Sequence, residues 1–214
     1  MLPASSVVFI VDDDVSVRES LESMVRQAGW NPKTYSTAQE FLDRQKESVP
    51  SCLVLDVSLP GLSGLDLQKQ IVDERSAMPI IFITGYGDVP MTVRAMKAGA
   101  MEFLTKPFSD EVLLSAIEQA LERSRVALIR DVEIRALQKA YLSLTPREQQ
   151  VMSLVVSGML NKQIGAELGI SEVTVKAHRG RVMEKMTAAS LADLVKMATR
   201  LRLGTSPRRK SPAA

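Results

Sequence analysis

Two spacings of hydrophobic residues alternate along the first half of the chain. Runs of consecutive apolar residues, such as residues 7–11, are typical of parallel strands that are buried on both faces. The segments between these runs place apolar residues at every third or fourth position, as amphipathic helices do. The predicted strands are residues 7–11, 33–35, 52–55, 79–83 and 103–104, and the predicted helices are residues 16–28, 38–45, 64–74, 88–98 and one starting at Asp110 after the cap Ser109. This pattern predicts an α/β fold with a doubly wound, five-stranded parallel sheet and right-handed crossovers.

The second half of the chain is predicted to be helical. Neither Gly nor Pro occurs from Glu111 to Leu142, so we expect the last helix of the sheet domain to continue as a linker over residues 124–143. Its apolar residues do not keep a regular heptad repeat, so the pattern does not decide whether the linker forms a coiled coil. Thr145-Pro146-Arg147-Glu148 has the form of a capping box and begins a small all-α domain over residues 144–203. Three more helices are expected over residues 162–168, 172–186 and 191–203, capped by Asn161, Ser171 and Ser190.

Charge divides the chain at the same place. Residues 1–124 carry 11 Lys and Arg against 18 Asp and Glu, a net charge of −7, whereas residues 125–214 carry 16 against 7, a net charge of +9. Two domains with different partners are therefore expected, and the basic half is a candidate for binding nucleic acid. A basic surface without such a partner is the alternative. The domains are predicted at residues 1–123 and 144–203, with a basic disordered tail over residues 204–214.

Composition narrows the class of protein further. The single cysteine, Cys52, cannot form an internal disulfide, and one histidine with one cysteine excludes a structural zinc cluster. No apolar run approaches the ~20 residues that a membrane-spanning helix needs. A basic segment is missing before the first apolar run, so no secretory signal is expected. These features predict a cytoplasmic location and no membrane partner.

Polar residues follow four of the predicted strands. Asp12 and Asp13 follow the first, Asp56 the third, Thr84 the fourth and Lys106 the fifth. Because the carboxyl ends of parallel strands form the functional edge of an open α/β sheet, these side chains are expected to meet there. Carboxylates that lie close together repel one another unless a cation joins them, and their oxygen atoms are ligands that Mg²⁺ favours. A Lys and a hydroxyl group nearby suit a phosphoryl group, by charge and by hydrogen bonding. The chemistry predicted is phosphoryl transfer onto a carboxylate.

Residues 7–123 resemble the receiver domain of two-component response regulators. The motifs that carry this resemblance are Val11-Asp12-Asp13-Asp14, the segment from Leu55 through Asp56 to Gly64, Ile83-Thr84-Gly85 and Lys106-Pro107-Phe108. The resemblance implies that Asp56 accepts the phosphoryl group. It also implies a cis peptide bond between Lys106 and Pro107 and an aromatic switch residue at Phe103; a static core residue is the other interpretation of Phe103.

The same resemblance implies a role for each residue of the acidic edge. Asp13 and Asp56 would bind Mg²⁺ directly, together with the main-chain carbonyl of Ser58, and Asp12 would bind it through water. Lys106 would pair with the phosphoryl group and Thr84 would donate a hydrogen bond to it. Ser58 and Tyr86 occupy positions that tune the lifetime of the phosphoryl group, and that lifetime stays open.

Residues 161–186 have the layout of a helix-turn-helix, with Gly169 in the turn. At 100° per residue, Val175, Val182 and Met186 share the face of the second helix that is expected to be core. Val173 falls on the opposite face, and Lys176 and Arg181 on that face are the expected groove and phosphate contacts. The full set of expected DNA-binding residues is Thr174, Lys176, Ala177, His178, Gly180 and Arg181.

Residues 144–203 resemble the LuxR-type helix-turn-helix output domain. The motifs are Leu144 to Glu148, Asn161-Lys162-Gln163-Ile164, and Thr174 to His178, so the whole chain is similar to the NarL/FixJ family of transcriptional regulators. Gly180 departs from relatives that present a longer side chain, and Gly165 stands where Ala is usual. Each Gly costs its helix about 1 kcal/mol relative to Ala.

The resemblance implies a regulator that a sensor histidine kinase phosphorylates on Asp56 and that binds promoter DNA as a homodimer formed on phosphorylation. Contact with RNA polymerase is left open, and no enzymatic activity is expected beyond its own phosphorylation and dephosphorylation. Two alternatives are a phosphotransfer module whose second half binds protein, and a ligand-gated LuxR-type quorum receptor. The basic half disfavours the first alternative, and the acidic edge disfavours the second.

Overall fold

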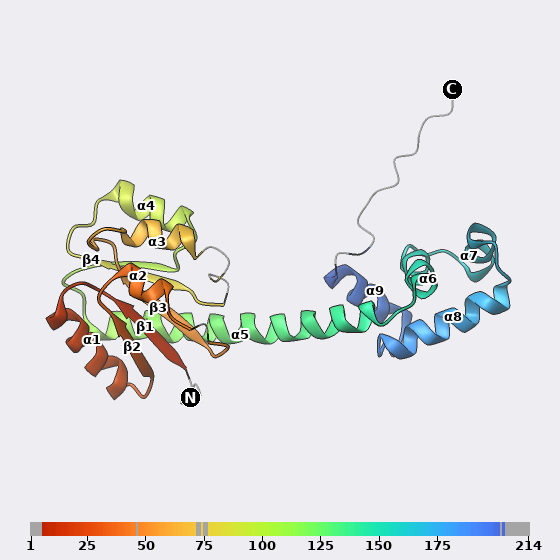
Figure 1. The fold of residues 1–214 in the computed structure, drawn as a ribbon, viewed down its shortest axis with the longest axis horizontal. Coiled ribbons are helices and arrows are strands. Elements are labelled where there is room, and N and C mark those ends of the chain that lie inside the picture. The colour runs from red at the N-terminus through yellow and green to blue at the C-terminus, as the bar shows by residue number, and fades with distance from the viewer. Residues whose placement is uncertain (1–5, 46, 72–73, 75–76, 202, 204–214) are drawn as a thin grey trace, which may run out of the picture. The chain divides into compact units, whose positions relative to one another are not determined.

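The computed structural model describes residues 6–45, 47–71, 74, 77–201 and 203, and Figure 1 shows its elements. The chain divides into two compact units, Met1–Arg130 and Asp131–Ala214. The boundary falls within one helix, α5 (Asp110–Leu142), which includes most of the predicted linker. The predicted tail over residues 204–214 lies outside the described residues. No helix among the described residues combines the length and hydrophobicity needed to cross a membrane.

A five-stranded parallel sheet forms the centre of the first unit. Its strands lie in the order β2-β1-β3-β4-β5, as the doubly wound fold requires. They are β1 (Val7–Val11), β2 (Asn31–Tyr35), β3 (Ser51–Asp56), β4 (Ile80–Thr84) and β5 (Glu102–Thr105). The predicted fold class is thereby confirmed.

Helices cover both faces of this sheet (Figure 1). The helices are α1 (Val15–Gln27), α2 (Ala38–Leu42), α3 (Gly64–Gln70), α4 (Val89–Lys97) and the first part of α5. Successive residues of β1 point to opposite faces, so Phe9 packs in the core beneath α2, α3 and α4, and Ile10 packs in the core beneath α1 and α5. This double burial explains why the strands appear in the sequence as continuous apolar runs.

Several predicted boundaries were wrong by a few residues. Strand β2 begins at Asn31 instead of residue 33, because β2 is an edge strand and tolerates the missing N–H of Pro32. Helix α2 ends at Leu42 instead of residue 45, because Arg44 turns back to donate to the carbonyl of Phe41 and stacks on its ring at 3.7 Å. Helix α3 ends at Gln70, and part of the predicted extension to residue 74 lies outside the described residues.

Ser124 ties α5 to the opposite end of the sheet from the acidic edge. Its buried hydroxyl accepts a hydrogen bond from the backbone N–H of Ser51 at 2.9 Å and donates to the carbonyl of Ala77. Two backbone groups at the start of β3 and before β4 are satisfied in this way, since buried polar groups need partners. The α5 helix is therefore fixed to the sheet as far as Ser124.

The second unit is a helical bundle around its own hydrophobic core. Its helices are α6 (Pro146–Val156), α7 (Asn161–Leu168), α8 (Glu172–Lys185) and α9 (Leu191–Arg200), and the end of α5 packs on their core. The capping box of Thr145 and Glu148 is present, and so are the caps Ser171 and Ser190. Helices α8 and α9 end before residues 186 and 203, where the sequence had placed their ends.

Two details of the helix-turn-helix differ from the sequence expectation. Leu160, and not Asn161, occupies the N-cap of α7, and the Asn161 side chain instead accepts a hydrogen bond from Arg179 on α8 at 3.1 Å. A Cβ at Gly165 would lie 2.7 Å from the carbonyl oxygen of Ile170. The helix-propensity cost of Gly165 is therefore offset by the close approach that the turn before α8 makes.

Candidate functional site

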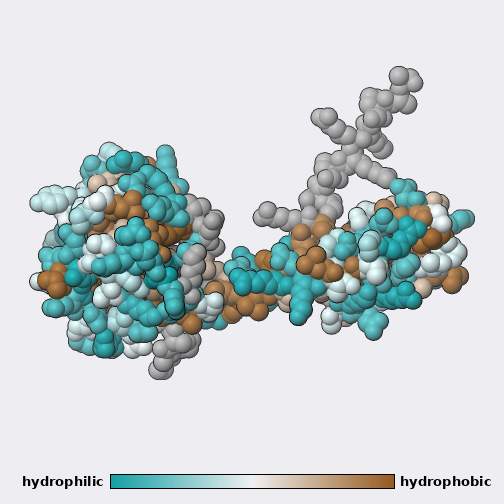
Figure 2. Space-filling model, in the orientation of Figure 1, coloured by the Kyte–Doolittle hydropathy of each residue, from teal (hydrophilic) through white to brown (hydrophobic). Residues whose placement is uncertain are grey.

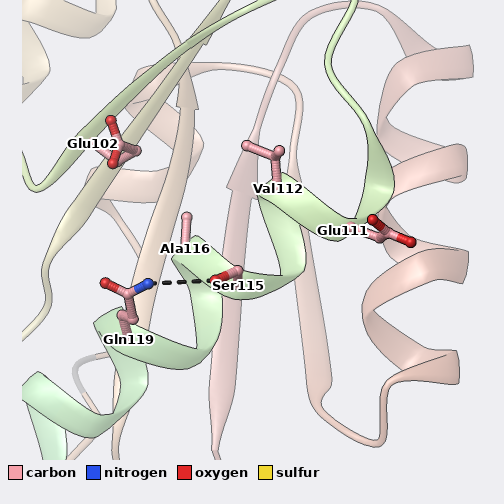
Figure 3. Close-up of a pocket in the computed structure, with 6 residues that line it drawn as sticks. All are labelled: Glu102, Glu111, Val112, Ser115, Ala116 and Gln119. Atoms are coloured by element: carbon pink, nitrogen blue, oxygen red, sulfur yellow. Dashed lines mark hydrogen bonds between the residues drawn. The ribbon is translucent and has the colours of Figure 1, made fainter.

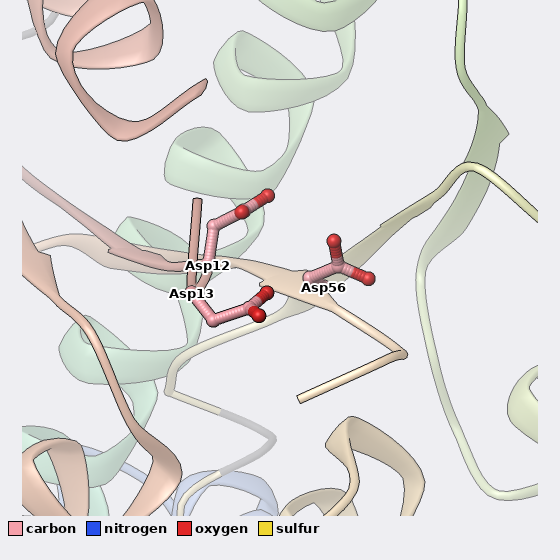
Figure 4. Close-up of side chains that lie close together, drawn as sticks. All are labelled: Asp12, Asp13 and Asp56. Atoms are coloured by element: carbon pink, nitrogen blue, oxygen red, sulfur yellow. The ribbon is translucent and has the colours of Figure 1, made fainter. Parts of the chain in front are cut away.

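Three carboxylates meet at the carboxyl ends of β1 and β3 (Figure 4). Asp12 and Asp13 follow β1 directly, and Asp56 is the last residue of β3. One oxygen from each carboxylate lies within 4.8 Å of the other two. Asp12 and Asp56 are buried, whereas Asp13 is exposed and faces solvent at the mouth of the cluster.

Lys106, which follows β5, bridges two of these carboxylates. Its Nζ donates to Oδ2 of Asp12 at 2.8 Å and to Oδ2 of Asp56 at 3.0 Å. Burial raises the pKa of Asp12, and the hydrogen bond from Lys106 opposes part of that rise. Burial alone would lower the pKa of Lys106, but its hydrogen bonds to Asp12 and Asp56 raise that pKa above the usual value. Lys106 therefore keeps its positive charge in the cluster.

The donor set at this edge fits a divalent cation such as Mg²⁺. All three side chains offer oxygen, the ligand atom that Mg²⁺ prefers, and a single Lys charge leaves the three carboxylates under-compensated. The backbone N–H of Ser58 donates to Oδ1 of Asp56 at 2.8 Å, which orients the carboxylate. The peptide bond between Lys106 and Pro107 is cis, as the family resemblance implied.

Thr84 and Phe103 lie beside this cluster on neighbouring strands. Thr84 is buried at the end of β4, and its Oγ1 accepts a hydrogen bond from the N–H of Tyr86 at 3.2 Å. Phe103, in β5, is partly buried, with its ring centre 6.1 Å from that of Phe82. A Cβ at Gly87 would lie 3.1 Å from the Phe103 ring and 3.4 Å from the Thr84 methyl group. The nearest atom to that Cβ would be the Thr105 methyl carbon at 2.8 Å, so a side chain at position 87 would crowd Thr84, Phe103 and Thr105.

Two residues of the site escaped the sequence reasoning. A Cβ at Gly64 would lie 2.2 Å from the backbone oxygen of Asp56, so α3 can begin here only because residue 64 lacks a side chain. Arg18 on α1 donates a hydrogen bond to the carbonyl oxygen of Asp12 at 2.7 Å. The Gly-rich segment after Asp56 carried a signal for Gly64, but Arg18 is an ordinary polar position of an amphipathic helix.

Helix α8 of the second unit presents the other predicted site. Lys176, Ala177, Gly180 and Arg181 are exposed on one face, while Val175, Val182 and Met186 are buried on the other, as helical periodicity predicted. Thr174 and His178 are partly buried at the edges of the exposed face. Lys176 forms only a solvent-exposed ion pair with Glu172, at 3.3 Å. A Cβ added at Gly180 would have no described atom within 4 Å, so this side of the helix is open to a partner.

Val173 is an exposed apolar residue on the same face of α8, at 76% exposure. The sequence analysis placed it on this face and did not count it among the DNA contacts. An apolar side chain at this position suits contact with a thymine methyl group.

An ion pair between a buried carboxylate and an exposed Lys holds α8 against the start of α6. Glu148, only 2% exposed, accepts from Nζ of Lys185 at 2.7 Å and from the N–H of Thr145 at 2.9 Å. The hydrogen bond from Lys185 is the main reason that the pKa of Glu148 lies below its usual value. Lys185 also donates to the carbonyl of Ser143, so one side chain joins α8 to the segment between α5 and α6.

Comparisons with known proteins assign both units. The family described as response regulator receiver domain matches residues 8–118, and the family of bacterial regulatory proteins called the luxR family matches residues 142–198. The transcriptional regulatory protein FixJ of Bradyrhizobium diazoefficiens is 40% identical over 193 residues, which cover 90% of this chain and 94% of FixJ. The chain belongs to the NarL/FixJ family of response regulators.

Other relatives of this response regulator align over nearly the whole chain. Nodulation protein W of Bradyrhizobium diazoefficiens is 50% identical over 196 residues, or 92% of this chain and 86% of that protein. The response regulator TodT of Pseudomonas putida is 46% identical over 94% of this chain and 89% of its own length. The solved structure of the response regulator StyR, 48% identical, superposes with a TM-score of 0.78 and covers 92% of this chain and 99% of that chain.

Family membership shows what this response regulator does in outline. It is a phosphorylation-dependent, DNA-binding transcriptional regulator of a two-component system, with a receiver domain followed by a helix-turn-helix domain. Its receiver domain implies a histidine kinase as a partner, and its luxR-type domain implies DNA binding.

Gly64→Ala is expected to destabilise the first unit by about 1–3 kcal/mol, because the new methyl group would overlap a backbone atom of Asp56. Gly85→Ala is the matched control, since nothing lies within 4 Å of a Cβ at that position, and it should change the free energy of unfolding by less than about 0.5 kcal/mol. Denaturant unfolding of the full chain measures both. Equal stabilities for the two variants would contradict the close approach of α3 to Asp56.

Glu148→Gln is expected to destabilise the second unit by about 1 kcal/mol at neutral pH. The expected loss is this small because Lys185 is partly exposed, and solvent weakens its attraction to Glu148. Because folding lowers the pKa of Glu148, the stability that its charge contributes is complete above the unfolded pKa and is lost as pH falls through the folded pKa. The difference in melting temperature between the wild type and Glu148→Gln should therefore shrink as pH falls below about 4.5.

Circular dichroism of the two proteins across this pH range makes the measurement. Glu184→Gln, at an exposed position of α8, is the control and should match the wild type throughout. A Glu148→Gln deficit that stays constant down to acid pH would show that the ion pair does not stabilise the fold.

Proposed function

We propose that Asp56 accepts a phosphoryl group from a sensor histidine kinase, in a site where Mg²⁺ binds to Asp13, Asp56 and the main-chain carbonyl of Ser58, and to Asp12 through water. The observation that carries this proposal is the meeting of three carboxylates within 4.8 Å beside a Lys that contacts two of them. Asp56 occupies the centre of this arrangement, because β3 lies between β1 and β4 in the sheet. Bound Mg²⁺ would supply positive charge opposite the phosphoryl oxygens.

Each side chain of the cluster then has a part in the transfer. A carboxylate oxygen of Asp56 forms the new bond to phosphorus, the bond from phosphorus to the histidine nitrogen of the kinase breaks, and the histidine keeps the electron pair. Lys106 is already 3.0 Å from Asp56 and pairs with the phosphoryl group. The Thr84 hydroxyl can rotate from Tyr86 to donate to it. The protein catalyses only its own phosphorylation and dephosphorylation.

The proposed response to phosphorylation passes through Thr84 and Phe103. A phosphoryl group with a charge of about −2 draws the Thr84 hydroxyl towards it, which vacates space that Phe103 enters by turning inward. The absence of a side chain at Gly87, where one would crowd Thr84 and Phe103, supports this movement. The surface formed by α4 and the start of α5 changes shape as a result.

That surface is the proposed contact between two copies of the chain. Along α4, Val89, Val93 and Met96 are exposed and recur at helical spacing, and Figure 2 shows hydrophobic surface over α4 and α3. Arg94 and Lys97 are exposed on the same helix. Exposed apolar residues bordered by charge are typical of a protein contact surface.

A groove beside this surface carries the opposite charge. It has a volume of about 300 Å³ and lies between β5 and α5, lined by Glu102, Glu111, Val112, Ser115, Ala116 and Gln119 (Figure 3). The carboxylates of Glu102 and Glu111 complement the cations of α4 on a second copy, as a two-fold contact requires. Dimerisation would raise affinity for paired DNA half-sites by linkage.

In the second unit, α8 is the proposed recognition helix for promoter DNA. Lys176 and Arg181 are exposed cations suited to phosphates and base edges, and Thr174, Ala177, His178 and Gly180 line the same approach. Contact with RNA polymerase would follow on the promoter. A DNA target and a lone buried thiol at Cys52 support a cytoplasmic location.

Asp56→Asn is expected to abolish acid-labile phosphate incorporation from acetyl phosphate and Mg²⁺, because the amide cannot form the acyl phosphate. The wild type should be labelled to near one phosphate per chain, and chelation of Mg²⁺ should remove the labelling. Asp43→Asn, at an exposed position of the same unit, is the control and should be labelled like the wild type. Persistent stoichiometric labelling of Asp56→Asn on another carboxylate would refute the assignment.

Beryllium fluoride, which mimics the phosphoryl group, is expected to convert the wild type from monomer to dimer in sedimentation experiments. Thr84→Ala should remain monomeric, because it lacks the hydroxyl that draws Phe103 inward. Val93→Glu should also remain monomeric while still accepting phosphate, and Val126→Glu, at a position of almost equal exposure on α5, is its control. If the wild type stays monomeric and still gains DNA affinity, the receiver acts by releasing the basic domain instead.

A further inference from the structure

Arg18 is a charged residue beside the acidic cluster that the phosphoryl-transfer chemistry leaves without a role. It is the fourth residue of α1, and its guanidinium reaches back past the N-cap Asp14 to the loop that follows β1. One guanidinium nitrogen donates to the carbonyl oxygen of Asp12 at 2.7 Å, a short bond of the kind that charged donors make. The side chain is partly buried, so this bond is shielded from full competition by water.

Asp12 is held at each of its other polar groups by a different partner. Its N–H donates to the carbonyl of Tyr35, its Oδ1 accepts from the N–H of Asp14 at 3.0 Å, and its Oδ2 accepts from Lys106. The carbonyl oxygen of Asp12 is held by Arg18. That carbonyl belongs to the planar peptide unit that joins Asp12 to Asp13, so a bond to it fixes the orientation of the whole unit.

Asp13 depends on that peptide unit for its direction. Its side chain is exposed and forms no hydrogen bond or ion pair with any residue that the structure describes. Its carboxylate points towards Asp56 (Figure 4), and the position from which it does so is set by the backbone at Asp13. Because Mg²⁺ requires near-ideal octahedral positions of its ligands, an error in that aim would weaken binding.

Arg18 also lies close enough to Glu40 on α2 for its charge to act there. The pKa of Glu40 on α2 is lowered first by hydrogen bonds from Ser36, and the positive charge of Arg18 adds to that lowering. Burial is the first cause of the raised pKa of Asp12, and Lys106, Asp14 and Asp56 also shift it. The contact that Arg18 makes with the acidic cluster is its hydrogen bond to the Asp12 carbonyl.

We propose that Arg18 is a positioning residue for the Mg²⁺ site. Arg18 holds the peptide unit between Asp12 and Asp13 so that the Asp13 carboxylate faces Asp56. This inference rests on the proposed phosphoryl-transfer site, because it assumes that Asp13 is a ligand of Mg²⁺. Residues that do not touch the metal but hydrogen-bond to its ligands and orient them commonly raise metal affinity about 10-fold or more.

The test measures Mg²⁺ binding to the full-length protein without a phosphoryl donor, by titration followed in the amide NMR spectrum. Arg18→Ala is expected to raise the half-saturating Mg²⁺ concentration about 10-fold. Arg18→Gln, whose shorter side chain does not reach the carbonyl, should show the same loss and keeps the test usable if the Ala variant does not fold. Arg18→Lys retains a charged donor and should recover most of the affinity.

Arg26→Ala is the matched control, since Arg26 lies on the same helix and pairs only with Glu22 in an exposed ion pair, and it should bind Mg²⁺ like the wild type. A metal-free readout accompanies the titration: the amide signal of Asp13 should shift in Arg18→Ala and not in Arg26→Ala. If folded Arg18→Ala or Arg18→Gln binds Mg²⁺ with wild-type affinity, the positioning role is overturned while the proposed function stands. If the wild type itself binds no Mg²⁺, the proposed function fails.

Discussion

Three carboxylates share one edge of the receiver sheet, and like charges this close repel one another unless cations lie among them. Lys106 supplies one positive charge, and its two hydrogen bonds join Asp12 after β1 to Asp56 at the end of β3. The charge that remains uncompensated makes the edge attractive to a divalent cation such as Mg²⁺, and in the proposed function a phosphoryl group adds negative charge next to Lys106. In the proposed function, the reactivity of Asp56 and its response to phosphorylation both depend on this balance of charge.

The rest of the first unit keeps these groups in place. Parallel strands covered on both faces bring residues 94 positions apart in sequence to one edge, and the missing side chain of Gly64 lets α3 begin against Asp56. The second unit has a different electrostatic design: the buried Glu148 pairs with Lys185 behind α8, and the cations Lys176 and Arg181 are exposed in front. The acidic unit therefore suits a cation, and the basic unit suits an anionic partner.

Sequence reasoning predicted the fold class, the five strands and the capping box, because burial on both faces and cap chemistry leave local signals. It also predicted that Asp12, Asp13, Asp56 and Lys106 would meet, because strand ends converge by topology. It missed what depends on distances across the fold. The bond from Arg18 to Asp12 and the bond from Arg179 to Asn161 each join residues whose local sequence gives no sign of the partner. The Gly-rich segment after Asp56 gave a signal for Gly64 but not for its close contact with the backbone of Asp56. Helix ends were misplaced where a side chain such as Arg44 turned back onto the helix.

The central claim is that phosphorylation of Asp56 controls DNA binding by α8. Its most direct test is the affinity of the full-length protein for a DNA fragment obtained by selection, measured at one salt concentration with and without acetyl phosphate and Mg²⁺. Phosphorylated wild type is expected to bind about 10-fold more tightly than the unphosphorylated protein, and Asp56→Asn is expected to show no change. An equal gain in Asp56→Asn, or no gain in wild type shown to carry the phosphate, would contradict the account.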